Sequence, residues 1–366
     1  MRKKVLIQMR DLRIGNGIAS SIMHFYEYTV RNGYKIDFLL NRNIESPFVN
    51  IVKRYDSSIY VLPNDTGKPN ISNFRYIKRI LNNGYDIIHV NISGLNAVMA
   101  LYVAKKIGIK IRIYHAHVPR ETSTIKARIR SLIYDTASVL EANKYVACSK
   151  YAGKSVFRKK DFKVFTNALD TYKYLYDLDA RLFYRREFRI ENKFVIGVVG
   201  RMSVQKNPKF IIDVFSEIVK LNPNAFLIWI GEGKLKSQIL RRINRKNIND
   251  KVIFLGTRCD VNKLYSAMDI FLLPSKFEGL GLVFVEAQIS GLPCFGSNKV
   301  PEDVNISPNM NFLSLKTPIK EWARQICEIS LANRRSYREN AEEAGFEIEK
   351  KKDALIDLYN TFLGIK

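Results

Sequence analysis

The sequence has few cysteines and no long hydrophobic run. Its four cysteines are scattered, without a Cys-x-x-Cys pair or a Cys/His cluster, which argues against a disulfide framework and against a structural zinc site. Its longest apolar runs are far shorter than the ~20 residues that a membrane-spanning helix needs, and no apolar signal-peptide core follows the N-terminal Met-Arg-Lys-Lys. We therefore expect a cytoplasmic protein with reduced cysteines.

Acidic residues are also scarce, which leaves a strongly basic chain. There are 60 Lys and Arg against 35 Asp and Glu, a formal net charge of +25. Charge of this size predicts an anionic partner, which can be nucleic acid, a membrane surface or a phosphorylated substrate. The hydrophobic share of 46% is ample for two cores, so 366 residues suit two domains of roughly 150–180 residues each.

Apolar runs that are typical of buried strands alternate with helical patterns along the whole chain. Repeated βα units predict parallel sheets flanked by helices, and ligands bind such sheets at the carboxyl ends of the strands. The strands are expected at Lys3–Gln8, Lys35–Leu40, Ser58–Leu62, Asp86–Asn91, Lys110–His115 and Lys144–Cys148, and then at Phe194–Gly200, Ala225–Gly233, Val252–Gly256, Ile270–Leu273, Leu292–Gly296 and Phe312–Leu315.

The stretch 274–288 joins one of these strands to a helix that is expected to begin just after Gly281. A helix N-terminus preceded by glycine presents bare backbone N–H groups, so the amides of Gly281 and Leu282 are suited to binding a phosphate. Two carboxylates bracket these amides, Glu278 in the loop and Glu286 in the helix. Their spacing would let them reach different parts of one ligand.

A second strand-to-helix loop contributes positive charge. Arg201 and Lys206 follow the strand Phe194–Gly200, and Pro208 favours the start of a helix directly after them. Arginine offers a rigid fork of donors and lysine a point charge, a combination suited to a diphosphate. Ordinary surface charge is the alternative interpretation.

Two strand ends in the first half of the chain carry further candidates. Gly15 and Gly17 precede a helix expected over 18–31 and would let the backbone approach a ligand, although a plain tight turn explains the pair equally well. His115 and His117 lie two residues apart, on one face of an extended chain. A structural role and metal binding are both open for them, but no third metal ligand lies nearby in the sequence.

The stretch 274–288 resembles the two-glutamate motif of retaining GT-B glycosyltransferases, especially those that build bacterial capsules and exopolysaccharides. Pro-Ser before the motif, Glu-Gly-Leu-Gly inside it and Glu-Ala after it carry the resemblance. Residues 200–207 resemble the donor-phosphate motif of the same family. Residues 163–170 resemble the segment that closes the first domain, with Thr166 and Ala168 where Pro and Gly are usual.

The resemblance implies the GT-B fold, an α/β architecture of two Rossmann-like domains with parallel sheets that face each other across a cleft. The expected first domain is 1–170, the linker is 171–192, and the second domain is 193–335. The remaining 336–366 is expected to form a C-terminal helix that packs back on the first domain. The first domain would then hold the acceptor and the second the nucleotide-sugar.

The resemblance also implies the reaction and the site. A sugar would move from a nucleotide-sugar, expected to be UDP-linked, to a hydroxyl of a lipid-linked saccharide, with anomeric retention and without a metal or other cofactor. His117 aligns best with the family's donor-sugar histidine, while His115 stands where other members often carry Thr. The catalytic candidates are Glu278, His117, Lys206 and Arg201, and the donor-binding candidates are Gly15, Gly17, His115, Gly200, Arg201, Lys206, Arg258, Gly279, Leu280, Gly281, Leu282 and Glu286.

Two other functions fit part of the sequence. A nucleotide-sugar epimerase of the same fold would share the donor residues but need no acceptor. A nucleic-acid-binding protein would suit the positive charge, but no RRM, KH or zinc-finger pattern is present, so no nucleic-acid partner is expected.

The positive charge is dense over 120–163, which holds 11 Lys or Arg against 4 Asp or Glu. Cations near an anionic leaflet attract a protein to the membrane, so we expect peripheral contact with the inner face of the cell membrane. We expect the apolar residues of the helix over 124–141 to pack on their own sheet. That helix alternates an apolar set, Ile125, Ile129, Leu132, Ile133 and Leu140, with the cations Lys126, Arg128 and Arg130.

Overall fold

The chain folds into two compact units. The computed structural model describes residues 2–14, 16–65, 70–119, 125–331 and 334–365, and the side chains of 125–127 lie outside this description. Unit 1 consists of Met1–Leu169 together with Ile348–Lys366, and unit 2 is Asp170–Glu347. No helix in the described ranges is both long and apolar enough to cross a membrane.

Unit 1 is a seven-stranded parallel sheet in the order β3-β2-β1-β4-β5-β6-β7. Its inner strand β1 is buried from Val5 to Met9, as expected for a parallel strand covered on both faces. The strands are β1 (Lys3–Met9), β2 (Tyr34–Leu40), β3 (Ile59–Val61), β4 (Ile87–Val90), β5 (Ile111–Ala116), β6 (Lys144–Ala147) and β7 (Lys163–Val164).

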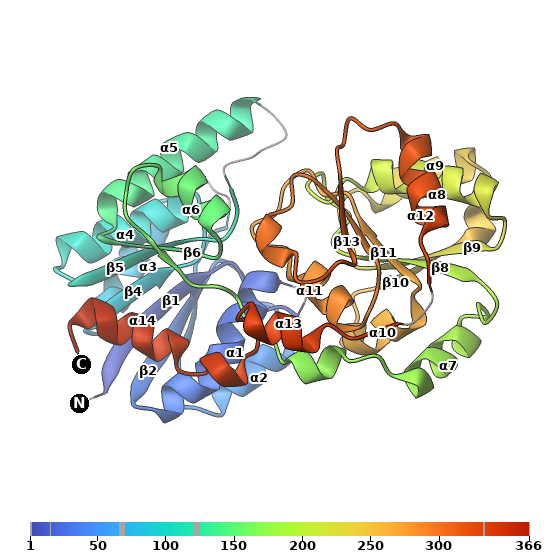
Figure 1. Ribbon diagram of the computed structural model, residues 1–366. Helices are drawn as coiled ribbons and strands as arrows, with labels where there is room; N and C mark the ends of the chain where they lie inside the picture. Colours follow the sequence, from blue (N-terminus) through green and yellow to red (C-terminus); the bar gives the residue numbers. More distant parts are fainter. Residues whose placement is uncertain (1, 15, 66–69, 120–124, 332–333, 366) are drawn as a thin grey trace. The chain divides into compact units, whose positions relative to one another are not determined.

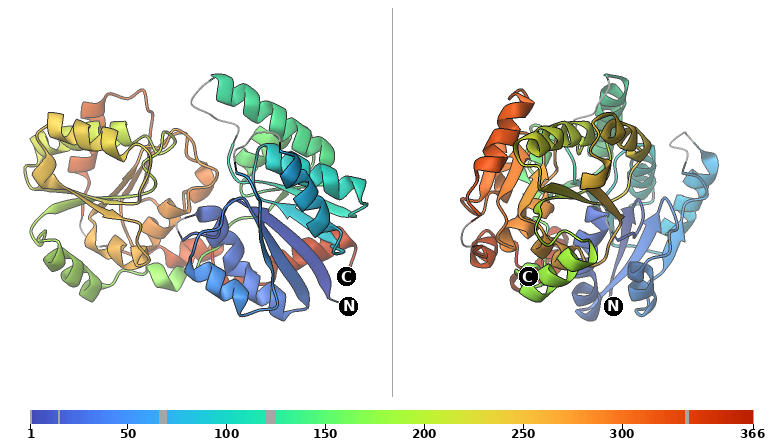
Figure 2. Two further views of the ribbon diagram at one scale, coloured as in Figure 1. Left: turned by 180° about the vertical axis from the view of Figure 1, so that it is seen from behind. Right: turned by 90° about the vertical axis from the view of Figure 1, so that its right-hand side faces the viewer.

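Helices cover both faces of this sheet (Figures 1 and 2). One core cluster joins the sheet to α1, α2 and α14, and a second joins it to α3, α4 and α6. The helices are α1 (Gly17–Arg31), α2 (Pro47–Lys53), α3 (Ile71–Leu81), α4 (Leu95–Lys106), α5 (Ile125–Glu141), α6 (Lys150–Phe157) and α14 (Ala354–Leu363).

Unit 2 is a six-stranded parallel sheet in the order β10-β9-β8-β11-β12-β13. Helix α7 lies on the opposite side of this sheet from α8 and α9 (Figure 2). The strands are β8 (Phe194–Val199), β9 (Ala225–Ile230), β10 (Val252–Gly256), β11 (Ile270–Leu273), β12 (Cys294–Ser297) and β13 (Met310–Leu313). The helices are η1 (Thr171–Tyr174), α7 (Leu178–Glu187), α8 (Pro208–Leu221), α9 (Lys236–Arg245), η2 (Asn249–Lys251), α10 (Val261–Ala267), α11 (Leu282–Ile289), η3 (Glu302–Val304), α12 (Ile319–Glu328) and α13 (Arg338–Glu343).

The segment 171–192, expected as a linker, is an ordered part of unit 2. It contains η1 and α7, and two arginines of α7 bind the carboxylate that precedes β11: Arg181 and Arg185 donate to Asp269 over 2.7 and 2.5 Å. Arg185 also donates to the carbonyl of Ala267. Two arginines of the expected linker are therefore partners in a half-buried ion-pair network.

The segment 336–366 also differs from the single C-terminal helix expected. Helix α13 belongs to unit 2, Gly345 follows it with a φ of +78°, and η4 (Glu349–Lys351) and α14 belong to unit 1. Positive φ suits glycine and ends the helix. Leu355, Leu358 and Tyr359 of α14 then enter the core of unit 1.

Helix α5 presents its apolar residues to the outside, contrary to the expectation that they pack on the sheet. Ile129, Ile133 and Leu140 are 53%, 59% and 69% exposed. The side that faces inward includes a polar group, since the buried carboxylate of Asp135 accepts a hydrogen bond of 2.6 Å from the Tyr114 hydroxyl on β5. Ile125 and Lys126 of the expected set have side chains outside the described part of the chain.

Candidate active site

The carboxyl ends of β8 and β11 adjoin in unit 2, since the two strands are paired neighbours. The loops that follow them are therefore side by side, and the backbone N–H of Lys276 donates to the carbonyl of Gln205 over 2.7 Å. This proximity brings Lys206 to Glu278, with Lys206 Nζ 2.7 Å from Glu278 Oε1. Gln205 Nε2 donates to the other carboxylate oxygen over 3.2 Å.

The Lys206–Glu278 ion pair is nearly withdrawn from solvent. The two side chains are 13% and 5% exposed. A buried ion pair contributes little net stability, because desolvation of both charges offsets their attraction. The pair holds a cation and a carboxylate at fixed positions, 2.7 Å apart.

Two glycines give the backbone of this site its shape. Gly231, at the end of β9, has a φ of +128°, and a Cβ there would lie 2.4 Å from the carbonyl oxygen of Gly200. Only glycine permits this approach of β9 to the loop after β8. Gly281 has a φ of +95° and precedes the first residue of α11, Leu282. Its left-handed conformation turns the chain from the Glu278 loop into the helix, whose first N–H groups have no intrahelical partner.

The remaining loop residues Gly279 and Leu280 are buried, with Leu280 4% exposed. Gly200 lies under Lys206, since a Cβ on Gly200 would meet the Lys206 stem at 3.4 Å. Gly200, Lys206, Glu278 and the start of α11 therefore form one cluster.

Glu286, one turn into α11, faces two tyrosines. The Tyr265 hydroxyl donates to Glu286 Oε2 over 2.7 Å, and the Tyr174 ring lies 6.1 Å from the Tyr265 ring. Burial raises the pKa of Glu286 to about 7, partly opposed by the Tyr265 hydrogen bond and by the positive charge of Lys206. The negative charge of Glu286 in turn raises the pKa of Tyr174.

Two predicted donor-binding arginines also follow strand ends of unit 2. Arg201 follows β8 directly and is exposed, and its carbonyl accepts a hydrogen bond of 2.7 Å from the Ser203 N–H. Arg258 follows β10, which β9 separates from β8. Its guanidinium binds Asp260 over 2.8 and 2.6 Å, and this contact holds the pKa of Asp260 at about 2.

The candidate histidines belong to unit 1. His115 is the last residue but one of β5 and is buried, and the His117 ring lies 3.9 Å from the His115 ring. His117 Nε2 is 2.8 Å from Asn91 Oδ1, and His115 Nδ1 is 3.1 Å from Nε2 of His89 on β4. Within the described ranges, no group of three or more His, Cys, Asp or Glu is placed to hold a metal ion.

Gly15 lies outside the described residues, and Gly17 is the first residue of α1. A Cβ on Gly17 would meet nothing within 4 Å, so packing does not require glycine there. Asn16 caps the helix, its side chain accepting a hydrogen bond from the Ile18 N–H over 3.2 Å. These observations describe an ordinary helix start.

Known proteins match both units. The family model described as "Glycosyltransferase Family 4" matches residues 15–172, and "Glycosyl transferases group 1" matches residues 181–347. The putative glycosyltransferase EpsF of Bacillus subtilis is 25% identical over 98% of this chain and 97% of its own length. The chain is a glycosyltransferase.

One further sequence relative and one solved structure also match this chain. An Escherichia coli protein named UDP-Gal:alpha-D-GlcNAc-diphosphoundecaprenol alpha-1,3-galactosyltransferase is 26% identical to the glycosyltransferase over 58% of each chain. The crystal structure of Anabaena HepE in complex with UDP-glucose matches with a TM-score of 0.79 at 19% identity, covering 98% of this chain and 99% of that chain. The expected GT-B fold class is confirmed, with two parallel-sheet α/β domains.

Sequence reasoning missed several residues that lie near the candidate residues within each unit of the glycosyltransferase. Tyr265 and Tyr174 were not candidates, because nothing in their local sequence separates them from core tyrosines. His89 had a usable signal: it pairs with Ile113 in register, so it shares a sheet face with His115 two residues later. Sheet order was needed to apply that signal.

The raised pKa of Glu286 predicts a pH dependence of stability. Its folded pKa of about 7 lies above the ordinary value of 4.5, so the native state binds more protons than the unfolded state between these values. This contribution to the free energy of unfolding should be full below pH 4.5 and disappear as pH rises to about 7. Urea unfolding of the wild type and of Glu286→Gln across this window is the measurement. Parallel curves for the two proteins would contradict the prediction.

Proposed function

We propose that the glycosyltransferase moves a sugar from a UDP-linked donor to a hydroxyl of a lipid-linked or oligosaccharide acceptor, with anomeric retention, in bacterial surface polysaccharide synthesis. The observation that carries the proposal is the buried Lys206–Glu278 pair beside the start of α11. The pair offers a cation to a diphosphate and a carboxylate to a sugar. The start of α11 offers backbone amides to the same diphosphate. UDP-glucose in the HepE structure and the acceptor named for the E. coli relative support the same chemistry.

In this proposal unit 2 holds the donor. Lys206, Arg201 and the first amides of α11 meet the diphosphate, whose negative charge grows as the bond from the anomeric carbon to the phosphate oxygen breaks. Preorganised donors aimed at developing charge lower the barrier, and they do so here without a metal. Glu278 steadies positive charge near the anomeric carbon, and Glu286 accepts the ribose hydroxyls. The acceptor oxygen bonds to the anomeric carbon, and its proton passes to the departing phosphate oxygen of UDP.

A panel of nucleotide-sugars tests the proposal. A UDP-sugar that binds the native state should raise the thermal unfolding midpoint, by mass action. Incubation of that UDP-sugar with and without a saccharide acceptor then separates the reactions. A transferase forms a new glycoside only with the acceptor, whereas an epimerase changes the donor without one. Proton NMR of the product should show the anomeric configuration of the donor. Inversion would overturn the retaining mechanism, and product without acceptor would favour the epimerase.

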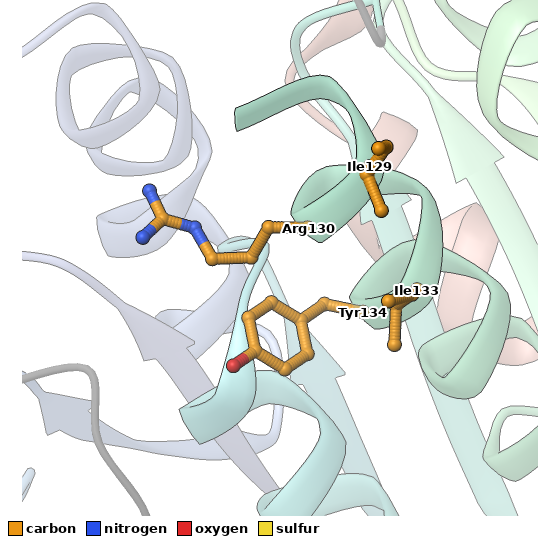
Figure 3. A pocket seen from close by; sticks show the side chains of 4 residues that line it. All are labelled: Ile129, Arg130, Ile133 and Tyr134. Carbon is orange, nitrogen blue, oxygen red and sulfur yellow. The ribbon is translucent and has the colours of Figure 1, made fainter. Parts of the chain in front are cut away.

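We also propose that unit 1 docks reversibly on the anionic inner face of the cell membrane through α5. The exposed Ile129 and Ile133 lie beside Arg130 and Tyr134, and the four line a surface hollow. In Figure 3, Arg130 and Tyr134 project to one side of the helix. Exposed apolar residues interleaved with cations suit the boundary between lipid headgroups and acyl chains. A lipid-linked acceptor would be reached there.

Flotation with liposomes tests this docking. Each cation near an anionic surface contributes roughly 1 kcal/mol, and the Debye length falls from about 10 Å at 0.1 M salt to about 3 Å at 1 M. The protein should therefore float with anionic vesicles at low salt, and much less at high salt or with neutral vesicles. Arg128→Glu with Arg130→Glu should abolish flotation. Arg241→Glu with Arg245→Glu on α9, an equal charge change in unit 2, should preserve it. If both double variants lost flotation equally, membrane binding would depend on net charge and not on α5.

A further inference from the structure

A chain of side chains in unit 1 links the candidate histidines to the C-terminal helix. The Tyr359 hydroxyl on α14 lies 3.0 Å from His89 Nδ1, and His89 Nε2 lies 3.1 Å from His115 Nδ1. The His89 and His115 rings are stacked, with centroids 5.2 Å apart. His117 packs on His115 and bonds to Asn91. The chain therefore runs from Tyr359 to the end of β5.

The three histidines are held neutral. Burial lowers the pKa of His89 and of His117 to about 3, and burial lowers the pKa of His115 well below its ordinary range. A neutral imidazole carries one N–H donor and one lone-pair acceptor. Each ring must therefore adopt one of two tautomers, and its hydrogen bonds select which.

The partners at the two ends of the chain select the tautomers. Asn91 Nδ2 donates to the carbonyl of His89 over 3.2 Å, so Asn91 Oδ1 is the atom that faces His117. His117 then carries its proton on Nε2 and its lone pair on Nδ1.

At the other end, His89 Nδ1 is the one hydrogen-bond partner of the Tyr359 hydroxyl among the described residues. A buried hydroxyl group whose proton makes no hydrogen bond costs free energy. Tyr359 therefore donates to His89, His89 donates from Nε2 to His115 Nδ1, and His115 carries its proton on Nε2.

This arrangement leaves two buried ring nitrogens open on adjacent rings. Within the described part of the chain, neither His115 Nε2 nor His117 Nδ1 has a hydrogen-bond partner. The first is a donor and the second an acceptor. A hydroxyl group, which accepts one hydrogen bond and donates another, satisfies both.

We propose that Tyr359 is a positioning residue that fixes the tautomer of His115 through His89, so that His115 Nε2–H and His117 Nδ1 together hold one hydroxyl of a saccharide ligand. The identity of the ligand rests on the proposed glycosyltransferase function, whereas the tautomers do not. Tyr359 belongs to α14, far along the chain from both histidines, and touches the ligand nowhere in this scheme. Its effect is to fix the polarity of the hydrogen-bond chain.

Nitrogen NMR of 15N-histidine-labelled protein measures the tautomers directly, and the chain has only 4 histidines to assign. The wild type should show His89, His115 and His117 protonated on Nε2. Tyr359→Phe removes the donor to His89 and should shift His89 and His115 toward the Nδ1-protonated form, leaving His117 unchanged. Tyr34→Phe is the matched control, because Tyr34 packs on Tyr359 and binds Asn360 of the same helix without touching a histidine.

Three outcomes overturn the proposal: His115 protonated on Nδ1 in the wild type, tautomers unchanged in Tyr359→Phe, or the same shift in Tyr34→Phe. Ligand binding is read with the nucleotide-sugar of largest thermal shift. It should move the His115 Nε2 and His117 Nδ1 resonances, and Tyr359→Phe should raise its KM about 2- to 10-fold at similar kcat, as for one lost hydrogen bond. If ligand binding leaves both resonances unchanged, the two histidines do not hold a hydroxyl of the ligand. If no nucleotide-sugar binds, the proposed function fails, and the variant comparison still decides the role of Tyr359.

Discussion

Replacing Glu278 with Gln should lower kcat about 100- to 1,000-fold and leave the donor KM nearly unchanged. The substitution keeps the shape and an acceptor oxygen for Lys206, 2.7 Å away, but removes the negative charge. A group that acts mainly on charge developing in the transition state affects turnover more than binding, and removal of such a group typically costs 10²–10³. Initial rates over a range of donor concentrations separate the two parameters.

Glu286→Ala is the matched control for this experiment, since Glu286 lies on the same motif and should contact the ribose. It should mainly raise the donor KM. If both variants changed kcat and KM in the same proportion, the division of roles between the two glutamates would be wrong. His117→Ala should resemble Glu278→Gln in lowering kcat, and His115→Ala should be milder.

Lys206→Ala should weaken UDP binding about 10- to 100-fold, because a hydrogen bond to a charged group is worth roughly 1.5–3 kcal/mol. It should also destabilise unit 2, since Glu278 would keep a buried charge without its partner. Loss of one member of a buried pair costs on the order of 3–5 kcal/mol. Calorimetry with UDP and denaturant unfolding measure the two effects.

Companion variants separate binding from stability. Lys206→Ala with Glu278→Gln removes both charges and should recover much of the stability but not the UDP affinity. Lys209→Ala removes an exposed lysine from the start of α8 and should change neither. Arg201→Ala should weaken UDP binding to a similar degree without the loss of stability, because Arg201 is exposed. If Lys206→Ala and Arg201→Ala both leave the UDP affinity unchanged, these two residues do not bind the diphosphate.

The sequence predicts this site well where one motif contains all the needed information. Strand β11, the turn at Gly281 and the start of α11 follow from an apolar run, a glycine and a helical pattern that adjoin in the chain. The contact between Lys206 and Glu278 does not follow, because it depends on β8 pairing with β11 and not with β10. Strand order is a property of the whole sheet.

The same limit explains the errors at α5 and at α7. The periodicity of α5 separates an apolar side from a charged one, but the buried Asp135 accepts a hydrogen bond from Tyr114 on β5, a partner that periodicity cannot identify. The arginines of α7 look solvated until Asp269 is placed beside them. In both cases a polar residue is buried because of a distant partner, and local composition points the wrong way.

Unit 1 is assembled from two separate stretches of the chain, and this order has a consequence for its synthesis. Translation releases the sheet and α1 first, then all of unit 2, and only then α14. Until α14 has been synthesised, the core of unit 1 lacks Leu355, Leu358 and Tyr359. The apolar residues of α1 and β2 in the same core are exposed during this time. Domains usually fold in the order in which they leave the ribosome. Here unit 1 is the first to be synthesised, but it can complete its fold only after all of unit 2 has been synthesised.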